Sequence, residues 1–591
     1  MIDTLAPVQI GAVEILLAAV PLLLAGVLLV GFLWPATRAM PIAWISALVI
    51  GFVVWNMPPD WLAAASIVGV MTALEILWIV FGALVLLYTL MQAGAFDRIN
   101  RGFAAVSDDR RVQIVLLGFF MATFIEGAAG FGTPAAVVAP LLLGLGFPAL
   151  AAVIAAIIGH IIAVTYGAVG TPIIVGIETP LDSVASTREA IEAGGFTVPE
   201  YAVQVAAWAA TYHALVGFIM PLFAVGMVVY FFGGDERSLD AAFEVAPLCL
   251  FAGIAFAIPY WASAWFLTAE FPALIGSMVG GAITVAVLRQ GYLLPDSKWE
   301  FPPQEEWPDH WVGTIEPGQS NGKTPAPDGG QSMSLAKAWS PYILLVVLLV
   351  ITRAVGPISD FINRSIFVTE WNNILGTTLG GAIGWANAPG FWLILSALVA
   401  IPLYGMSGQQ VKDAWTEAAQ KIAAPFVALV FVIAMVQVML QSGAHAEVVA
   451  EIPTMVVEGS EQPVSMIEAL AITTANIVGP AYPFISALIG ALGAAMAGSN
   501  TVSNITFGNF QFVSAQQLGL PTQIIVGAQA VGGAIGNLVA IHNVVAALAT
   551  VGLVGQEGRI MRLNLIPLIY YSLMVGVIAM VFSYVLFPAL F

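Results

Sequence analysis

The chain has 591 residues, of which 60% are hydrophobic and 9% are charged, and its formal net charge is −18 at pH 7. This composition is typical of a polytopic membrane protein and argues against a soluble multidomain protein. The negative charge argues against nucleic-acid binding, because an acidic surface repels phosphate. Cys249 is the only cysteine, which excludes an intrachain disulfide and a cysteine-based metal cluster.

Twelve apolar stretches are long enough to cross a membrane as helices. They lie at roughly 11–34, 40–57, 61–93, 148–175, 203–232, 242–260, 271–289, 338–356, 389–404, 422–440, 521–548 and 564–590. Two weaker segments remain: 361–388 is interpreted as an amphipathic or broken helix, and 464–480 as a surface or partly inserted helix. We therefore predict an all-α polytopic membrane protein with about twelve transmembrane helices and two additional re-entrant hairpins.

The first predicted hairpin covers 112–147, where three glycines, a proline and Glu126 interrupt an apolar run. In hydrocarbon, broken backbone is tolerated only where protein or a water-filled cavity covers it. An arm of 14 residues, 112–125, rises roughly 21 Å, which is too short for a core of about 30 Å. We therefore expect a hairpin with Glu126 at its tip.

A second predicted hairpin covers 482–518 and is interrupted by polar and small residues at 497–508. Ser499 precedes Leu518 by 19 residues, and Glu126 precedes Leu145 by the same 19. Paired broken segments in corresponding halves indicate the binding site of a secondary transporter. The equal spacing indicates a repeat, and the loop charges described next make it an inverted one.

Loop charges suggest the orientation and the domain boundaries. The 94–111 loop carries four arginines, whereas the 176–202 and 441–463 loops are acidic, so the first is expected in the cytoplasm and the others outside. The first hairpin then enters from the cytoplasm and the second from outside. We predict an N-terminal membrane repeat at 1–289, a partly disordered cytoplasmic linker at 290–336 and a C-terminal repeat at 337–591.

The two tips have the chemistry of an anion site. Helix N-termini present free N–H groups that suit a carboxylate, and glycines let a ligand approach the backbone. The candidate substrate-binding residues are Gly127, Gly130, Thr133, Ser499, Asn500, Thr501, Ser503 and Asn504. Their alternative role is helix packing, which small residues also serve in membranes.

Three ionisable residues are candidates for proton coupling: Glu126, His160 and His542. An ionisable group at a broken membrane helix is a functional-site hypothesis by default, and histidine titrates near physiological pH. Glu126 is our first choice, with a structural carboxylate that caps a helix as its alternative. For each histidine the alternative is a hydrogen-bonded interior side chain. No spacing resembles a metal site, and we expect no cofactor.

The motif residues resemble the L-lactate permease family across most of the membrane chain. The matching motifs are Glu126-Gly-Ala-Ala-Gly-Phe-Gly-Thr-Pro134, Leu145-Gly-Phe147, Tyr166-Gly-Ala-Val-Gly170, Gly498-Ser-Asn-Thr-Val-Ser-Asn504 and Val551-Gly-Leu-Val-Gly555. The resemblance implies a proton symporter for L-lactate, D-lactate and glycolate in the plasma membrane of a bacterium or archaeon, the inner membrane where there are two. The triplet Ser499-Asn500-Thr501 is also similar to the tips of sodium-coupled dicarboxylate carriers of the same ion-transporter superfamily, which work as elevators. The resemblance therefore implies an elevator-type transporter.

This chain departs from the family at several site positions. Family members often have Asp where Asn500 stands, Asn where His160 stands, and Lys where Asn537 stands. These departures keep sodium-coupled transport of another organic acid open as an alternative. An anion channel and an intramembrane enzyme are alternatives of other classes, and the sequence has no nucleophile or metal motif for the enzyme. The expected partners are a small carboxylate, a proton or sodium ion and the lipid bilayer; the oligomeric state is left open.

Overall fold

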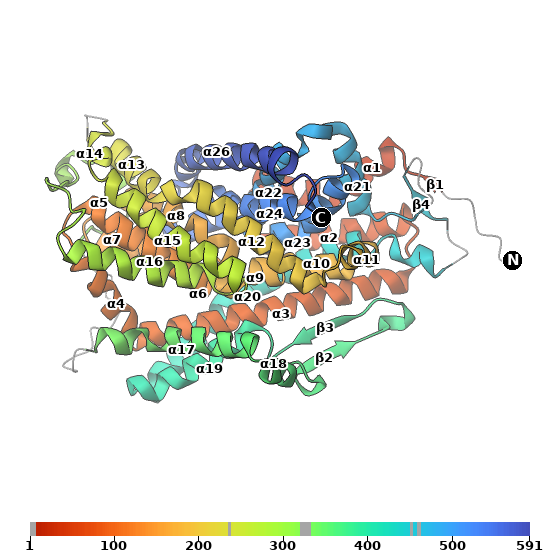
Figure 1. Cartoon of the computed structure of the whole chain (residues 1–591), viewed down its shortest axis with the longest axis horizontal. Coiled ribbons are helices and arrows are strands. Elements are labelled where there is room, and N and C mark those ends of the chain that lie inside the picture. The colour runs from red at the N-terminus through yellow and green to blue at the C-terminus, as the bar shows by residue number, and fades with distance from the viewer. Residues whose placement is uncertain (1–7, 235–237, 319–332, 450–452, 458–461, 591) are drawn as a thin grey trace.

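The computed structural model describes residues 8–234, 238–318, 333–449, 453–457 and 462–590. Its helices run mainly along one long axis (Figure 1). Within the described residues, thirteen are long and apolar enough to cross a membrane: Ala12–Gly31, Ala36–Val53, Pro59–Gln92, Arg110–Ala129, Ala149–Ser183, Val198–Phe232, Ala246–Phe266, Pro272–Arg289, Leu335–Arg353, Gly408–Leu440, Met466–Ala497, Thr522–Val539 and Glu557–Leu586. The predicted all-α polytopic class is confirmed. Arg110–Ala129 and Met466–Ala497 are additional to the expected spans, whereas the expected span 389–404 is a shorter apolar helix, Pro389–Tyr404.

The first four helices are α1 (Ala12–Gly26), α2 (Ala36–Val53), α3 (Pro59–Gln92) and α4 (Ala95–Ala104). Helix α3 is about 51 Å long at 1.5 Å per residue, so it exceeds the hydrocarbon core. It begins with a proline in its first turn, where the missing N–H costs nothing. It ends just before Gly94, whose φ of +73° turns the chain into α4.

The first hairpin is built from α5 (Arg110–Gln113), a π-helical stretch (Ile114–Met121), α6 (Ala122–Ala129) and α7 (Thr133–Gly144). Its first arm thus has 20 residues, not 14, and is long enough to span. The tip is formed by Gly130, Phe131 and Gly132, all with positive φ. Glu126 therefore lies one helical turn before the tip rather than at it, because the glycines fix the turn.

The predicted span 148–175 is a broken helix. It consists of α8 (Ala149–His160), a 3₁₀ segment (Ile161–Tyr166) and α9 (Gly167–Ile174), inside which three residues have positive φ. Two short helices follow, α10 (Glu178–Ser183) and α11 (Ala185–Ala193). The rest of the N-terminal half is α12 (Val198–Val216), α13 (Met220–Phe232), α14 (Asp240–Glu244), α15 (Ala246–Phe266) and α16 (Pro272–Arg289).

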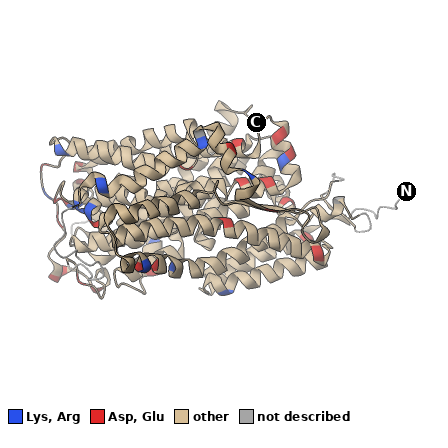
Figure 2. Ribbon diagram, turned by 90° about the horizontal axis from the view of Figure 1, so that it is seen from below, with Lys and Arg blue, Asp and Glu red and all other residues tan. Residues whose placement is uncertain are grey.

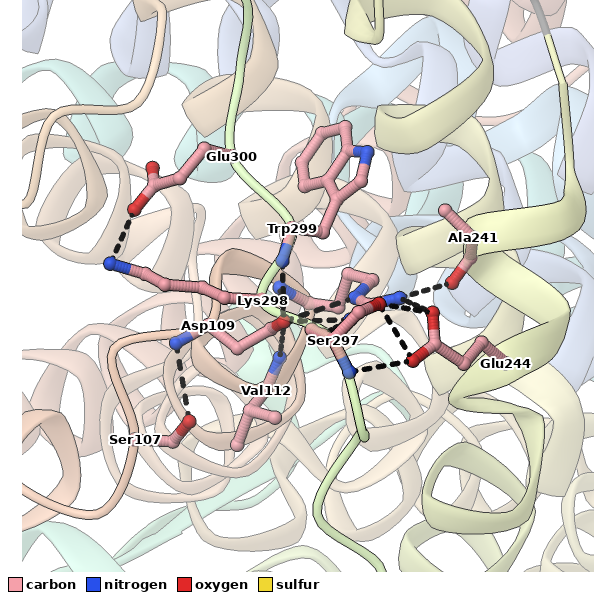
Figure 3. A network of polar contacts seen from close by, with 10 residues as sticks. Ser107, Asp109, Val112, Ala241, Glu244, Ser297, Lys298, Trp299 and Glu300 are labelled. Atoms are coloured by element: carbon pink, nitrogen blue, oxygen red, sulfur yellow. Dashed lines mark hydrogen bonds and ion pairs between the residues drawn. The ribbon is translucent and has the colours of Figure 1, made fainter.

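The linker docks on the bundle through a buried arginine (Figure 3). The fully buried Arg111 guanidinium donates to Asp109 at 2.7 Å, to Glu244 at 2.7 Å and to the carbonyls of Ala241 and Ser297 at 2.8 and 2.6 Å. An arginine that is fully buried needs such partners, because an unpaired buried charge is strongly unfavourable. The contact with Ser297 fixes the start of the linker to the start of the first hairpin.

Further along, the linker joins both halves of the chain. The Thr314 N–H donates to the Gly552 carbonyl at 2.9 Å, and the Gly318 N–H donates to the Leu143 carbonyl at 3.0 Å. Trp307 and Trp311 are buried, and burial of such large rings stabilises the docked form. Residues 290–318 of the linker are therefore docked on the bundle; residues 319–332 lie outside the described residues, so partial disorder of the linker stays a prediction.

The C-terminal half begins with α17 (Leu335–Ala354) and α18 (Gly356–Ile362). The predicted helix at 361–388 is wrong: apart from the end of α18 and two short 3₁₀ turns, this segment is an antiparallel pair, β2 (Val368–Trp371) with β3 (Gly381–Gly384), in which Val368 faces Gly384. Exposed polar residues and several glycines in this segment disfavour a helix. Helices α19 (Pro389–Tyr404) and α20 (Gly408–Leu440) follow and pack against α3.

The second hairpin is α22 (Tyr482–Ala497) and α23 (Asn500–Gln517), joined by Gly498 and Ser499. Helix α21 (Met466–Val478) precedes it, and α24 (Thr522–Gly536), α25 (Ile541–Thr550) and α26 (Glu557–Val581) follow it. Residues 464–480 thus contribute a helix that continues almost directly into the hairpin. Two-residue strands β1 (Val8–Gln9) and β4 (Met455–Val456) pair in parallel.

The two hairpins are followed by similar elements and exchange contacts. Each is followed by a helix, α8 or α24, that passes into a 3₁₀ segment and then a short helix, α9 or α25. Helix α7 of the first hairpin packs against α25, and α23 of the second packs against α9. Two hairpin tips and two helix breaks therefore meet in one place.

Candidate functional site

A cavity lies where the tips and breaks meet. It has a volume of about 350 Å³ with its open mouth included. The lining residues come from the first tip, the first break, the second tip and the second break: Glu126, Gly130, Phe131, Gly132, His160, Val164, Gly167, Pro172, Gly498, Ser499, Asn500, Thr501, Asn537 and Asn543. Broken backbone in a membrane protein that lines a cavity is the usual setting of a transporter site.

Close backbone approach positions the first tip. A Cβ atom at Gly130 would lie 2.9 Å from the Ala168 nitrogen, and one at Gly132 would lie 2.6 Å from the Asn543 side-chain oxygen. Gly130 and Gly132 also have positive φ, which glycine adopts without steric strain. Phe131 between them has a φ of +52°, an unfavourable value for an aromatic residue. Such strain concentrates at functional sites.

Glu126 and His160 are the two ionisable side chains among the described residues that line the cavity. Their exposed fractions are 4% and 3%, and Glu126 Oε2 lies 3.9 Å from His160 Nε2. His160 Nδ1 lies 2.7 Å from the Ala156 carbonyl, which only accepts, so Nδ1 carries a hydrogen. Nε2 is then the nitrogen that gains or loses a proton, and it faces the carboxylate.

Gly167 makes room for the Glu126 carboxyl group. A Cβ atom at Gly167 would lie 2.3 Å from Glu126 Oε1, which is shorter than any real contact of this kind. Gly167 is the first residue of α9, directly after the 3₁₀ segment. The break between α8 and α9 therefore brings His160 and Gly167 to opposite oxygens of the same carboxyl group.

The second tip begins a helix that faces the cavity. Ser499 caps α23 by accepting a hydrogen bond from the Val502 N–H at 3.4 Å. Asn500 is only loosely held: Nδ2 lies 3.5 Å from the Val164 carbonyl, and Oδ1 has no hydrogen-bond partner among the described residues. Because an unpaired buried polar atom is unfavourable, Asn500 has capacity for a ligand.

Four predicted site residues lie outside the cavity lining. Gly127 packs closely on Ala273 of α16, Thr133 begins α7 behind the tip, and Ser503 and Asn504 bond to the carbonyls of Gly490 and Pro172. They support the tips instead.

His542 lies at the second tip but not on the lining. Its Nε2 lies 3.0 Å from the Ala497 carbonyl, which ends α22. A Cβ atom at Gly498 would lie 2.2 Å from the same nitrogen. His542 is thus a side chain held at the tip by a backbone hydrogen bond, and it does not contact Glu126 within ion-pair distance.

Sequence reasoning missed several lining residues. Asn543 donates from Nδ2 to Asn537 Oδ1 at 2.7 Å, and this asparagine pair forms the wall contributed by the second break. Asn537 and Asn543 lie in an apolar run after the second hairpin. Polar side chains in such a run could have marked them as candidate site residues. Val164, Gly167 and Pro172 line the first break, which was predicted as one continuous span; the glycines and Pro172 were the available signal there.

The sequence pattern of the L-lactate permease family matches residues 14–586. The chain is similar to the L-lactate permease of Bacillus subtilis, with 26% identity over 90% of this chain and 89% of the relative. It is similar to the L-lactate permease of Escherichia coli K12, with 25% identity over 91% and 90%. It is also similar to the glycolate permease GlcA of the same organism, with 24% identity over 96% of both chains.

Proposed function

The chain belongs to the L-lactate permease family, and on this premise we propose that it imports L-lactate and related small 2-hydroxymonocarboxylates, including D-lactate and glycolate, with a proton. As a family member it is a multi-pass plasma-membrane transporter and not an enzyme. The observation that carries the proposal is a cavity between the first hairpin tip and the N-terminus of α23, whose only ionisable lining pair, within the described residues, is Glu126 with His160.

The substrate carboxylate is assigned to the N-terminus of α23, where Asn500 and Thr501 line the cavity, opposite the backbone of the first tip at Gly130–Gly132. Neither lysine nor arginine is among the described residues that line the cavity. The free N–H groups and the positive dipole end of a helix bind an anion without a basic side chain. A neutral site suits a monocarboxylate, because one negative charge is then balanced by partial charges alone.

The 2-hydroxyl group is assigned to Asn500. Its Oδ1 lacks a partner among the described residues, and a hydroxyl is a donor that supplies one. A net contribution of roughly 1 kcal/mol is usual for a neutral hydrogen bond, which corresponds to about a fivefold preference over propionate. A sodium ion is the rival ligand for the same oxygen, and sodium-coupled transport is therefore the alternative proposal.

The transported proton is assigned to the Glu126–His160 pair. With one proton the pair is neutral or a balanced ion pair, whereas without it a buried carboxylate stands alone, which is unfavourable. A deprotonated Glu126 also repels an incoming carboxylate. Proton and substrate therefore favour each other's binding, and this coupling is reciprocal.

We assign alternating access to the exchange of contacts between the hairpins, as in an inverted-repeat elevator. The support is the matched order of hairpin, helix, 3₁₀ segment and short helix in both halves. An anion channel does not require two hairpin tips that close one cavity, whereas alternating access does. Accessibility of introduced cysteines at Phe131 and Thr501 tests the assignment: both tips reachable from only one side in every state would contradict it.

The decisive experiment for the function is radiolabelled L-lactate uptake into proteoliposomes. We expect accumulation when a pH gradient, acidic outside, is imposed without sodium. Accumulation driven by a sodium gradient alone supports the sodium alternative, and equilibration without accumulation under either gradient supports a channel. No uptake of lactate or glycolate under any gradient would overturn the substrate assignment.

A further inference from the structure

A second, larger hollow lies away from the site, between α4, the first arm of the first hairpin, α16 and α17. It has a volume of about 990 Å³ with its open side included. Its lining is almost wholly apolar, with Phe103, Phe120, Phe124, Met278, Val285 and Trp339 among the larger side chains. Trp339 packs edge-on to Phe124 at a centroid distance of 4.6 Å. In Figure 1, α4, α16 and α17 lie together at the lower left.

The hollow has the depth of one membrane leaflet. Its lining on α16 runs from Ser277 to Arg289, and twelve residues of helix rise about 18 Å. Half of a hydrocarbon core of about 30 Å is about 15 Å. Helices α16 and α17 are both among the candidate spans, so this groove faces lipid along its length.

Two arginines stand at one end of the groove. Arg289 lines the groove and is exposed, and its guanidinium group has no hydrogen bond or ion pair with another described residue. Arg98 Nε donates to the Met333 carbonyl at 2.8 Å, and its Nη1 lies 3.9 Å from where a Cβ atom at Gly102, another lining residue, would stand. No carboxylate is found among the described residues of the lining. Figure 2 shows several lysines and arginines at the left end of the bundle.

We propose that this groove binds an anionic phospholipid, with an acyl chain against Met278, Trp339 and Ile343 and the phosphate at Arg289 and Arg98. The apolar walls match the chain, and the arginines, which have no carboxylate beside them in the lining, match the head group. Basic pockets between transmembrane helices are recognised sites of this kind. A lipid without net charge matches the apolar walls of the groove but leaves both arginines without an anionic partner.

The groove also lies beside the substrate site. Phe124 is two residues before Glu126 on the same arm, and Gly127 packs on Ala273 of α16. A bound acyl chain lies against α17, whose Trp339 packs on Phe124 of that arm. Occupancy therefore stabilises one arrangement of the first hairpin relative to α17, which makes the lipid a regulator of transport as well as a structural ligand.

The test compares phosphatidylglycerol with phosphatidylcholine of identical acyl chains, on purified full-length protein in detergent. Native mass spectrometry measures retained lipid, and thermal unfolding measures the rise in Tm. We expect selective retention of phosphatidylglycerol, and about fivefold weaker binding in Arg289→Gln from the roughly 1 kcal/mol that one basic residue contributes. Arg562→Gln, an exposed cation elsewhere, is the control and should bind as the wild type does.

A second pair of variants tests the groove itself. Ala282 lines the groove and is exposed, whereas Ala286, one turn along α16, is exposed but does not line it. Ala282→Trp should abolish retention of phosphatidylglycerol and Ala286→Trp should not. Equal retention of both lipids by the wild type, or equal behaviour of the two tryptophan variants, would overturn the proposal. Should the variants fail to fold, the wild-type comparison of head groups decides alone.

Discussion

Replacement of Glu126 by Gln should separate binding from energy coupling. Gln keeps the shape of the protonated carboxyl group but carries no transferable proton. Its amide can point nitrogen at His160 Nε2, where the present separation is 3.9 Å, and oxygen at Gly167. Because no hydrogen bond of normal length is lost, the change in unfolding free energy should stay within about 1 kcal/mol.

The expected loss is large for accumulation and small for exchange. With one proton per substrate, a pH gradient of two units supports at most about hundredfold accumulation, at 1.36 kcal/mol per unit. In proteoliposomes Glu126→Gln should reach only the external concentration under this gradient. Exchange of internal for external radiolabelled lactate should continue, because the cavity and its helix N-termini are unchanged.

Glu75→Gln is the matched control. Glu75 is an acidic residue within α3, an apolar span, and it does not line the cavity. This variant should accumulate lactate like the wild type. If Glu126→Gln also accumulates lactate under the pH gradient, Glu126 does not carry the proton and the coupling argument is wrong. If it loses exchange and thermal stability together, the carboxylate is structural.

Three further outcomes follow from the geometry. Asn500→Ala should weaken lactate binding about fivefold and leave propionate binding unchanged; equal losses in competition assays would remove the hydroxyl assignment. Gly167→Ala should abolish accumulation, because its Cβ would meet Glu126 Oε1 at 2.3 Å; unchanged uptake would contradict this contact. The Arg111 guanidinium holds the pKa of Glu244 below its ordinary value of about 4.5. Linker docking is therefore most stable above pH 4.5, and it weakens as the pH falls through the lowered pKa of Glu244. Limited proteolysis of 290–318 should accelerate at that acid pH in the wild type, and Glu244→Gln should remove the dependence.

The sequence was sufficient for features with a local signal. Glycines at the first tip and a glycine followed by serine at the second mark where helices stop, and the structure has helix ends there. Positive φ at a helix end is a property that glycine supplies locally. Glu126 and His160 are each candidates on their own, but their proximity has no local signal, because 34 positions separate them.

Breaks set by tertiary contacts could not be predicted from the sequence. The 3₁₀ segment 161–166 is apolar and continuous with α8, so its pattern predicts one unbroken span. Its contacts come from distant residues: Thr165 bonds His213 at 2.7 Å, and the Tyr166 hydroxyl donates to the Ala206 carbonyl. The β2–β3 pair could not be predicted either, because short exposed strands show little alternation of apolar and polar residues.

The break after α8 brings together the residues of the proposed coupling site. In a continuous α-helix, His160 and Gly167 are seven residues apart, about two turns or 10 Å along the axis. In the structure His160 Nε2 lies 3.9 Å from one carboxyl oxygen of Glu126, and Gly167 lies against the other. The carboxyl group is thereby enclosed between a histidine nitrogen and a glycine that leaves it space. If the pair carries the proton as proposed, coupling depends on the backbone path of 161–167 as much as on the two ionisable residues.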